Sequence, residues 1–192
     1  MKKMITVPNI LSASRIILLP VLIYLVLVDA RLVFLWLYLI VGATDAFDGI
    51  IARKFNQVSE FGKTIDSVAD LLFYIATAWF LYHLYPAYIL ANLTLLFSFF
   101  GLLGFSFILS AILIKAPVMM HTNMLRWAAV LVYMLVINSY FLDTTLFVRF
   151  ILIFYLIGFT EEIFIFILYP DFDRDAKSIW HLYQDKKKIT SS

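Results

Sequence analysis

Long apolar stretches separated by short polar breaks dominate the pattern along the chain. They cover roughly residues 10–28, 31–53, 62–82, 86–114, 123–141 and 146–168. A helix needs about 20 apolar residues to cross a bilayer, and each stretch comes close to that length. The fourth stretch is long and contains Gly101 and Gly104, so we expect its helix to tilt, bend or extend beyond the bilayer. The pattern predicts an all-α, polytopic membrane bundle of six transmembrane helices.

The composition also indicates a membrane protein. Of the 192 residues, 64% are hydrophobic, a share well above that of a typical soluble domain. No polar stretch is long enough to form a second core, so we expect a single domain over residues 1–192, with a short N-terminal segment at about 1–9 and a tail at about 169–192. The absence of cysteine excludes disulfides, thiolate metal sites and a cysteine nucleophile. No cleavable signal precedes the first apolar stretch, so we expect it to stay in the membrane.

Basic residues are concentrated on one side of the predicted bundle. The N-terminal segment, the second and fourth loops, the tail and the adjoining helix ends hold Lys2, Lys3, Arg15, Arg53, Lys54, Lys63, Lys115, Arg126, Arg174, Lys177, Lys186, Lys187 and Lys188. The opposite side carries Arg31 and Arg149 alone. Because basic loops stay in the cytoplasm, we expect both termini to be cytoplasmic in a multi-pass protein of the cell membrane.

Four carboxylates interrupt the apolar pattern between the second and third stretches. Asp45 and Asp48 are three residues apart, and Asp66 and Asp70 are four residues apart. Each spacing places its pair on one face of a helix. Converging carboxylates repel one another unless cations hold them, which favours a divalent metal site. The predicted orientation places this site on the cytoplasmic side.

The carboxylates belong to a longer pattern of fixed spacing, D-x2-D-G-x2-A-R-x8-G-x3-D-x3-D. Its specified positions are Asp45, Asp48, Gly49, Ala52, Arg53, Gly62, Asp66 and Asp70. The pattern resembles the signature of the CDP-alcohol phosphatidyltransferases, and the opening with Pro8, Asn9, Leu11, Ser12 and Arg15 is similar to that family as well. The resemblance implies a phospholipid-synthesis enzyme that transfers a phosphatidyl group from a CDP-activated lipid, CDP-diacylglycerol, to a small alcohol and releases CMP.

The resemblance further implies roles for the four aspartates. Asp45, Asp48 and Asp66 would ligate two Mg2+ or Mn2+ ions. Asp70 would share the second ion and serve as the base that takes the proton from the attacking hydroxyl. Independently of the family, oxygen ligands suit these hard ions, and displacement of CMP from phosphorus needs charge neutralised on the pyrophosphate.

Other residues of the pattern would hold the CDP-linked lipid. By resemblance these are Pro8, Asn9, Gly49, Ala52, Arg53, Ser59 and Gly62. Glycine and alanine let a nucleotide approach the backbone, and Arg53 is a fixed cation that can grip a phosphate with two hydrogen bonds. Ser59 could instead be the cap of the third helix, and Gly62 could be a packing glycine.

A second group of polar residues is the candidate site for the acceptor alcohol. It comprises Lys115, His121, Arg126 and Glu161. Family members commonly carry a basic residue near the start of the fifth span, and Arg126 is our candidate, although its side chain could instead snorkel to the interface. Glu161 and Glu162 point about 100° apart, so at most one faces the site fully, and one of them is expected to pair with Arg126 or to contact a headgroup.

The identity of the acceptor is open on the sequence alone. Phosphatidylglycerophosphate synthases often have a proline and a lysine around the second pair of acids, where this chain has Ser67 and Leu71. The cytoplasmic cations favour an anionic acceptor, and glycerol 3-phosphate is favoured over inositol phosphate or serine. The resemblance also implies a homodimer that contacts membrane lipids, and no nucleic acid is expected as a partner.

Two other classes of protein compete with the enzyme. A divalent-cation transporter would use the intramembrane acids to carry ions, but it needs a polar path to the far side, where the second and third stretches show no ionisable group beyond Arg31. A non-catalytic family member is disfavoured by the complete pattern.

Overall fold

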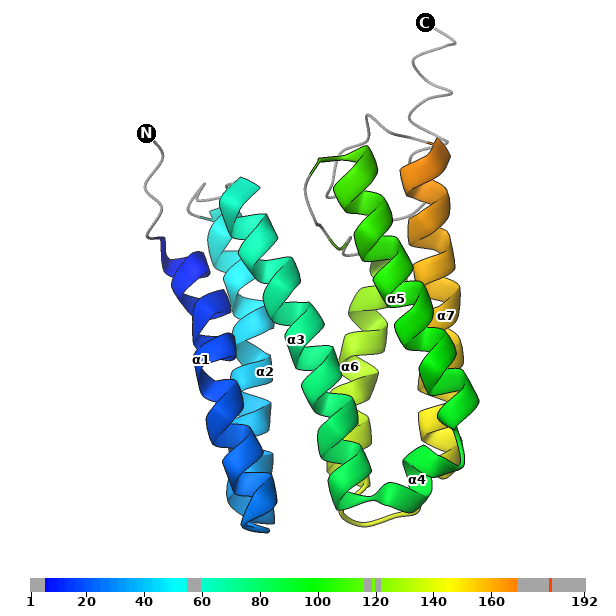
Figure 1. The fold of residues 1–192 in the computed structure, drawn as a ribbon. Coiled ribbons are helices and arrows are strands. Elements are labelled where there is room, and N and C mark those ends of the chain that lie inside the picture. The colour runs from blue at the N-terminus through cyan, green and yellow to red at the C-terminus, as the bar shows by residue number, and fades with distance from the viewer. Residues whose placement is uncertain (1–5, 55–59, 116–118, 120–121, 169–179, 181–192) are drawn as a thin grey trace, which may run out of the picture. The chain divides into compact units, whose positions relative to one another are not determined.

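The chain folds into α-helices in the computed structural model shown in Figure 1, which describes residues 6–54, 60–115, 119, 122–168 and 180. The helices are α1 (Val7–Leu27), α2 (Arg31–Lys54), α3 (Glu60–Leu84), α4 (Pro86–Leu90), α5 (Leu93–Leu113), α6 (Asn123–Asn138) and α7 (Thr145–Leu168). These described residues contain no strand. The prediction of an all-α protein is therefore confirmed.

The helices form two compact units, each with its own packing. The first unit comprises Met1–Leu90 with Ser139–Phe141, and the second comprises Ala91–Asn138 with Leu142–Ser192. In the first unit, α1 packs against both α2 and α3; in the second, α7 packs against both α5 and α6. The carboxylates that the sequence singles out on α2 and α3 thus belong to the first unit.

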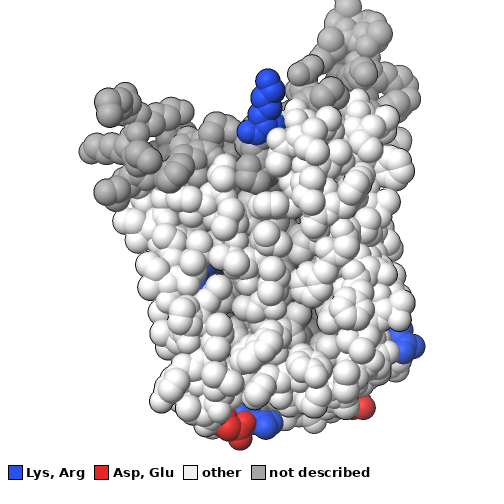
Figure 2. All heavy atoms as spheres, in the orientation of Figure 1, with Lys and Arg blue, Asp and Glu red and all other residues white. Residues whose placement is uncertain are grey.

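Four helices are long and apolar enough to cross a membrane. The candidate spans are Asn9–Leu27, Thr64–Leu84, Leu93–Leu113 and Thr145–Leu168, and shorter apolar helical stretches cover Arg31–Thr44 and Asn123–Asn138. Figure 2 shows that the visible sides of the helices are almost free of charged side chains. These features are those of a membrane protein with four candidate spans in the described residues, and the expected six spans stay a prediction.

The predicted fourth segment, residues 86–114, was wrong as a single helix. α4 ends at Leu90 and α5 begins at Leu93, with a turn at Ala91 and Asn92 between them. Gly101 and Gly104, the residues suspected of weakening this segment, lie inside α5, and a Cβ added to either would meet no atom within 4 Å. The interruption is therefore located at the turn rather than at a glycine.

Asn92 explains the interruption, because its amide is used in a contact across the second unit. Its φ of −126° and ψ of 17° take it out of the helix. The side chain is 3% exposed; it donates to the carbonyl oxygen of Thr145 at 3.0 Å and accepts from Nε of Arg149 at 3.2 Å. A buried amide gains from such partners, so the turn that allows them is stabilised.

An aromatic cluster joins α2 to α3 in the core of the first unit. Tyr38 stacks on Phe73 with ring centroids 5.2 Å apart, and Phe34 meets Phe80 edge to face at 5.0 Å. The hydroxyls of Tyr38 and Thr77 share a hydrogen bond of 3.1 Å. Large rings therefore bridge α2 and α3, and the hydrogen bond fixes how one helix is placed along the other.

The opposite end of α2 carries a small polar cluster. Asp29, which has a φ of 54°, ends the turn after α1, and aspartate is one of the few non-glycine residues that adopt this left-handed conformation readily. Its Oδ1 accepts from Nε of Arg31 at 2.7 Å. The guanidinium of Arg31 lies 6.0 Å from the ring centroid of Tyr85, and the hydroxyl of Tyr140 donates to the carbonyl oxygen of Arg31 at 2.7 Å. These contacts hold the loop residue Tyr140 at the start of α2.

Candidate active site

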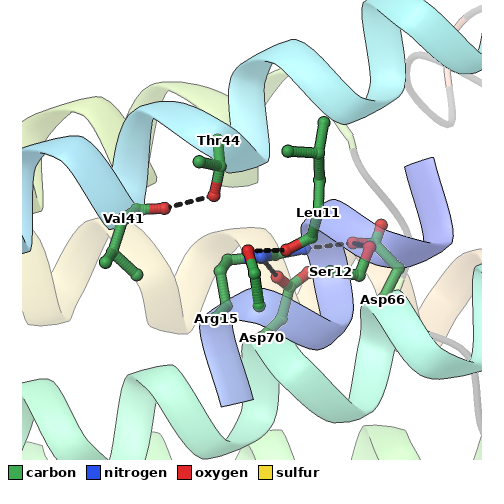
Figure 3. A network of polar contacts seen from close by, with 8 residues as sticks. Leu11, Ser12, Arg15, Val41, Thr44, Asp66 and Asp70 are labelled. Atoms are coloured by element: carbon green, nitrogen blue, oxygen red, sulfur yellow. Dashed lines mark hydrogen bonds and ion pairs between the residues drawn. The ribbon is translucent and has the colours of Figure 1, made fainter. Parts of the chain in front are cut away.

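A buried arginine of α1 bridges the two aspartates of α3 (Figure 3). Nη1 of Arg15 donates to Oδ1 of Asp70 at 2.5 Å, and Nη2 donates to Oδ1 of Asp66. Ser12 lies one turn earlier on α1, and its hydroxyl also donates to Oδ1 of Asp66, at 3.1 Å. The side chain of Arg15 is 2% exposed. The carboxylates that were predicted to converge are therefore joined by a cation.

Helical spacing brings these four residues together. Ser12 and Arg15 are three residues apart on α1, whereas Asp66 and Asp70 are four apart on α3, so each pair occupies one helix face. Because α1 packs directly on α3, the two faces meet. Asp70 is buried and Asp66 is only partly buried, with side-chain exposures of 10% and 21%. Asp66 is thus the more accessible of the two carboxylates.

The acids lie on the same stripe of α3 as the aromatic cluster. Asp66, Asp70, Phe73, Thr77 and Phe80 follow one another at intervals of four, three, four and three residues. Residues at these intervals share one face of a helix. The packing of the rings against α2 therefore also sets the direction in which α3 presents its acids.

The other predicted residues of the metal and CDP-lipid sites are described less completely. Asp45, Asp48, Gly49, Ala52 and Arg53 lie in the last turns of α2, but their side chains are outside the described part of the structure. Ser59 is outside the described residues altogether. The roles that the family resemblance implies for these positions stay predictions.

The first helix begins slightly earlier than residue 10, where the first apolar stretch was predicted to start, so it includes Pro8 and Asn9. Both residues lie in the first turn of α1, which begins at Val7. The side chain of Thr6 caps this helix by accepting from the backbone nitrogen of Asn9 at 3.4 Å, and proline is tolerated in a first helical turn because its missing N–H has no partner there. Asn9 is buried, and Gly62, on α3, is half-buried.

The candidates for the acceptor site belong to the second unit, whereas Asp66 and Asp70 belong to the first. Lys115 follows α5 and is exposed, Arg126 on α6 is exposed, and Glu161 on α7 is half-buried. His121 is outside the described residues. The role of this group in binding the acceptor alcohol stays a prediction.

Glu162 is the inward-facing member of the pair of glutamates. Its side chain is fully buried, and Oε2 accepts a hydrogen bond of 2.7 Å from the hydroxyl of Ser106 on α5. One partner of Glu162 is therefore a hydroxyl, and the expected pairing of one of the two glutamates with Arg126 or a headgroup stays a prediction. The serine could not be singled out from the sequence, because hydroxyls are common along α5.

Sequence reasoning also passed over Arg15 as a site residue. The signal was present, because Arg15 ends the opening that resembles the family, but an arginine near the start of an apolar stretch fits a role in membrane orientation equally well. Its contact with the acids depends on how α1 packs on α3. The sequence does not specify that packing.

The donor set of this region is suited to a hard divalent cation. Asp66 and Asp70 supply oxygen ligands, which Mg2+ and Mn2+ prefer, and a carboxylate that accepts from an arginine retains further lone pairs for a metal. Among the described residues no group of three or more histidine, cysteine, aspartate or glutamate side chains is placed to hold an ion. The described acids Asp66 and Asp70 can thus supply part of the ligand set expected for such an ion, and the contribution expected from Asp45 and Asp48 stays a prediction.

Comparisons with known proteins agree with the sequence pattern. Residues 5–166 match the family model described as CDP-alcohol phosphatidyltransferase. The chain is 46% identical over 67 residues to a CDP-diacylglycerol--glycerol-3-phosphate 3-phosphatidyltransferase of Aquifex aeolicus (strain VF5), a match that covers 35% of this chain and 38% of the relative. It is 47% identical over 66 residues to a cardiolipin synthase (CMP-forming) of Rattus norvegicus, covering 34% of this chain and 22% of the relative.

The alignments with curated relatives are shorter than the family match. A CDP-diacylglycerol--glycerol-3-phosphate 3-phosphatidyltransferase of Rickettsia typhi (strain ATCC VR-144 / Wilmington) is 44% identical over 68 residues, which are 34% of this chain and 38% of the relative. The chain thus matches well under half the length of these relatives. The family model, by contrast, extends from the start of α1 almost to the end of α7. On that match, the chain belongs to the CDP-alcohol phosphatidyltransferase family.

Proposed function

We propose that this protein is a metal-dependent phosphatidyltransferase that moves a phosphatidyl group from CDP-diacylglycerol to a small alcohol and releases CMP. The observation that carries the proposal is the network of Arg15, Asp66 and Asp70, because it organises two of the pattern's acids at the packed face of α1 and α3. The family match over residues 5–166 supports the same reaction.

The reaction requires one bond exchange at phosphorus. The oxygen of the alcohol forms a new bond to the phosphorus that carries the diacylglycerol, and the bond from this phosphorus to the CMP oxygen breaks, so that CMP leaves with the electron pair. Asp70 takes the proton of the attacking hydroxyl. Two bound Mg2+ or Mn2+ ions would supply neutralisation of the pyrophosphate charge, and Asp45, Asp48, Asp66 and Asp70 would hold them.

Helical spacing supports a contribution from α2 to the proposed metal site. Phe34, Tyr38 and Val41 are buried, and they follow one another at intervals of four and three residues. Positions 45 and 48 continue these intervals to the end of α2. In this proposal the aromatic cluster between α2 and α3 sets the separation of the two acid pairs.

The remaining assignments follow the family resemblance. The CDP-linked lipid would be held by Pro8, Asn9, Gly49, Ala52, Arg53, Ser59 and Gly62, and the acceptor by Lys115, His121, Arg126 and Glu161. The proposal includes a single domain of six spans, both termini and the site on the cytoplasmic side of the cell membrane, and a homodimer. The basic residues of the predicted cytoplasmic loops support this orientation.

Glycerol 3-phosphate is the acceptor that we favour. The names of the Aquifex and Rickettsia relatives contain this alcohol, and an anion suits the basic residues at the predicted cytoplasmic side. The similarity to a cardiolipin synthase (CMP-forming) supports a second candidate, in which the acceptor alcohol is itself a phospholipid.

The test is CMP release by the purified protein from CDP-diacylglycerol, with Mg2+ or Mn2+, while one acceptor at a time is supplied. The panel contains glycerol 3-phosphate, inositol phosphate, serine and phosphatidylglycerol. We expect metal-dependent CMP with glycerol 3-phosphate. If no alcohol gives it, the enzyme proposal fails, and metal uptake into proteoliposomes without CDP-lipid would favour a transporter instead.

Asp70→Asn is the variant that tests the proposed base. Asparagine preserves the size of the side chain but cannot take up the proton, so we expect CMP release to fall by at least about 100-fold, the scale of general-base catalysis. Asp29→Asn is the matched control, because Asp29 lies in the same unit at the opposite end of α2 and asparagine tolerates its φ of 54°. Near-normal turnover by folded Asp70→Asn protein would remove Asp70 as the base.

A further inference from the structure

Arg15 is a buried cation in contact with two carboxylates that the proposed function uses for metal binding and proton transfer. The guanidinium reaches Asp70 through Nη1 and Asp66 through Nη2. It is too deeply buried, at 2% exposure, to be one of the lysines or arginines that orient a membrane helix from its surface. The contact of Arg15 with the two carboxylates therefore needs an explanation other than the orientation of α1 in the membrane.

We propose that Arg15 is a positioning residue for Asp66 and Asp70, one that holds the two carboxylates as a fixed pair and lowers their attraction for divalent metal. The inference rests on the proposed function, since it assumes that these acids serve the transfer reaction. α1 then contributes to the affinity for metal without supplying a ligand.

The shape of the guanidinium is suited to this role. Asp66 and Asp70 are one helical turn apart, which is about 6 Å along the axis of α3, and two different nitrogens of a rigid planar group reach them. A lysine carries the same charge as a compact point, so it cannot fix two carboxylates in the same way. Substitution of Arg15 by lysine therefore separates the effect of the positive charge from the effect of holding both carboxylates.

Removal of the cation is expected to move metal affinity and turnover in opposite directions. Arg15 repels a divalent cation that approaches the same carboxylates, so its loss strengthens the attraction between the acids and the metal. The carboxylates also lose the groups that orient them, and the loss of such outer partners typically costs about 10- to 100-fold in metal affinity or activity. Because the repulsion of the metal is relieved at the same time, we expect this cost to fall on activity. A residue that merely stabilised the fold would weaken both properties together.

The experiment compares the wild-type protein with Arg15→Gln and Arg15→Lys, purified in detergent. Binding of Mn2+ is measured directly by the electron paramagnetic resonance signal of the free ion, and CMP release is measured in parallel. Arg31→Gln is the matched control, because it removes an arginine from an exposed contact with Asp29 in the same unit. We expect the control to leave both readouts unchanged.

For Arg15→Gln we expect about tenfold tighter Mn2+ binding, because a positive charge beside the carboxylates is removed, together with at least about tenfold slower CMP release. For Arg15→Lys we expect wild-type Mn2+ binding, because the charge is retained. We expect slower CMP release, because lysine cannot hold both carboxylates as the planar guanidinium does. Unchanged or weaker Mn2+ binding by folded Arg15→Gln protein would overturn the inference. If that variant does not fold, wild-type turnover by Arg15→Lys would overturn it.

The two proposals fail in different ways. If the wild-type protein releases no CMP with any alcohol, the proposed function fails, while tighter Mn2+ binding by Arg15→Gln would still support the role of Arg15 in setting metal affinity. If the wild-type protein releases CMP and both Arg15 variants match it in rate and in Mn2+ affinity, the inference about Arg15 fails alone. A wild-type protein that binds no Mn2+ overturns the inference as well.

Discussion

Phe80 provides a test of whether the aromatic cluster fixes the acids of α3. Its side chain is 1% exposed, and it meets Phe34 edge to face at 5.0 Å and Tyr38 at 6.3 Å. Phe80→Ala removes the ring from the stripe that also carries Asp66 and Asp70. We therefore expect a less stable protein and slower CMP release, although the substitution is about three turns away from the acids.

The magnitude follows from the space left by the ring. In a bilayer the surroundings of a helix are already apolar, so little is gained or lost by transfer from water, and the cavity is the main cost. A void on the order of 100 Å3, at about 24 cal/mol per Å3, costs about 2 kcal/mol. For a chain of this size that corresponds to a melting temperature lower by about 5 °C.

The measurement is thermal unfolding in detergent, with CMP release followed on the same preparation. Tyr82→Ala is the control, because Tyr82 lies on the same helix and is 49% exposed, so its removal leaves no buried cavity. We expect the control to melt within about 1 °C of the wild-type protein. If Phe80→Ala has the same melting temperature as the control and releases CMP at the wild-type rate, the aromatic cluster does not position the acids.

Two further predictions concern the packing of α7 against α6 and the loop residue Tyr140, which contacts the start of α2. A Cβ on Gly158 would lie 2.8 Å from Cδ2 of Leu125, so Gly158→Val should destabilise the protein by about 1–3 kcal/mol in a denaturation assay, whereas Gly101→Val, with open space around it, should not. Burial raises the pKa of Tyr140 to about 12 from its ordinary 10.0. Stability from this group is complete below pH 10 and is lost as the pH rises towards 12, so Tyr140→Phe should reduce the alkaline decline of the melting temperature, and an unchanged decline would contradict the assignment.

The sequence predicted the elements whose signals are local. The polar break at Asp29 and Arg31 gave the start of α2 correctly. The turn at Asn92 was missed, because its main stabilising contacts reach Thr145 and Arg149, which are more than 50 residues away in the chain. A hydrophobicity pattern contains no information about such a partner.

The candidate site shows the same limit. The spacing of Asp66 and Asp70 was sufficient to predict that they share a helix face, and the structure confirms it. The pattern did not predict that Arg15 lies between them, because that contact depends on the packing of α1 against α3. The inward direction of Glu162 likewise depends on which face of α7 meets α5.

The buried arginine also constrains how the protein is assembled. Arg15 lies in the first candidate span, whose mean hydropathy is 2.3, and its partner Asp66 is 51 residues further along the chain. A lone arginine is costly in lipid, and so are two lone aspartates. We therefore expect α1 to reach its final packed place only once α3 is present, because contact between the two helices neutralises the charges of both.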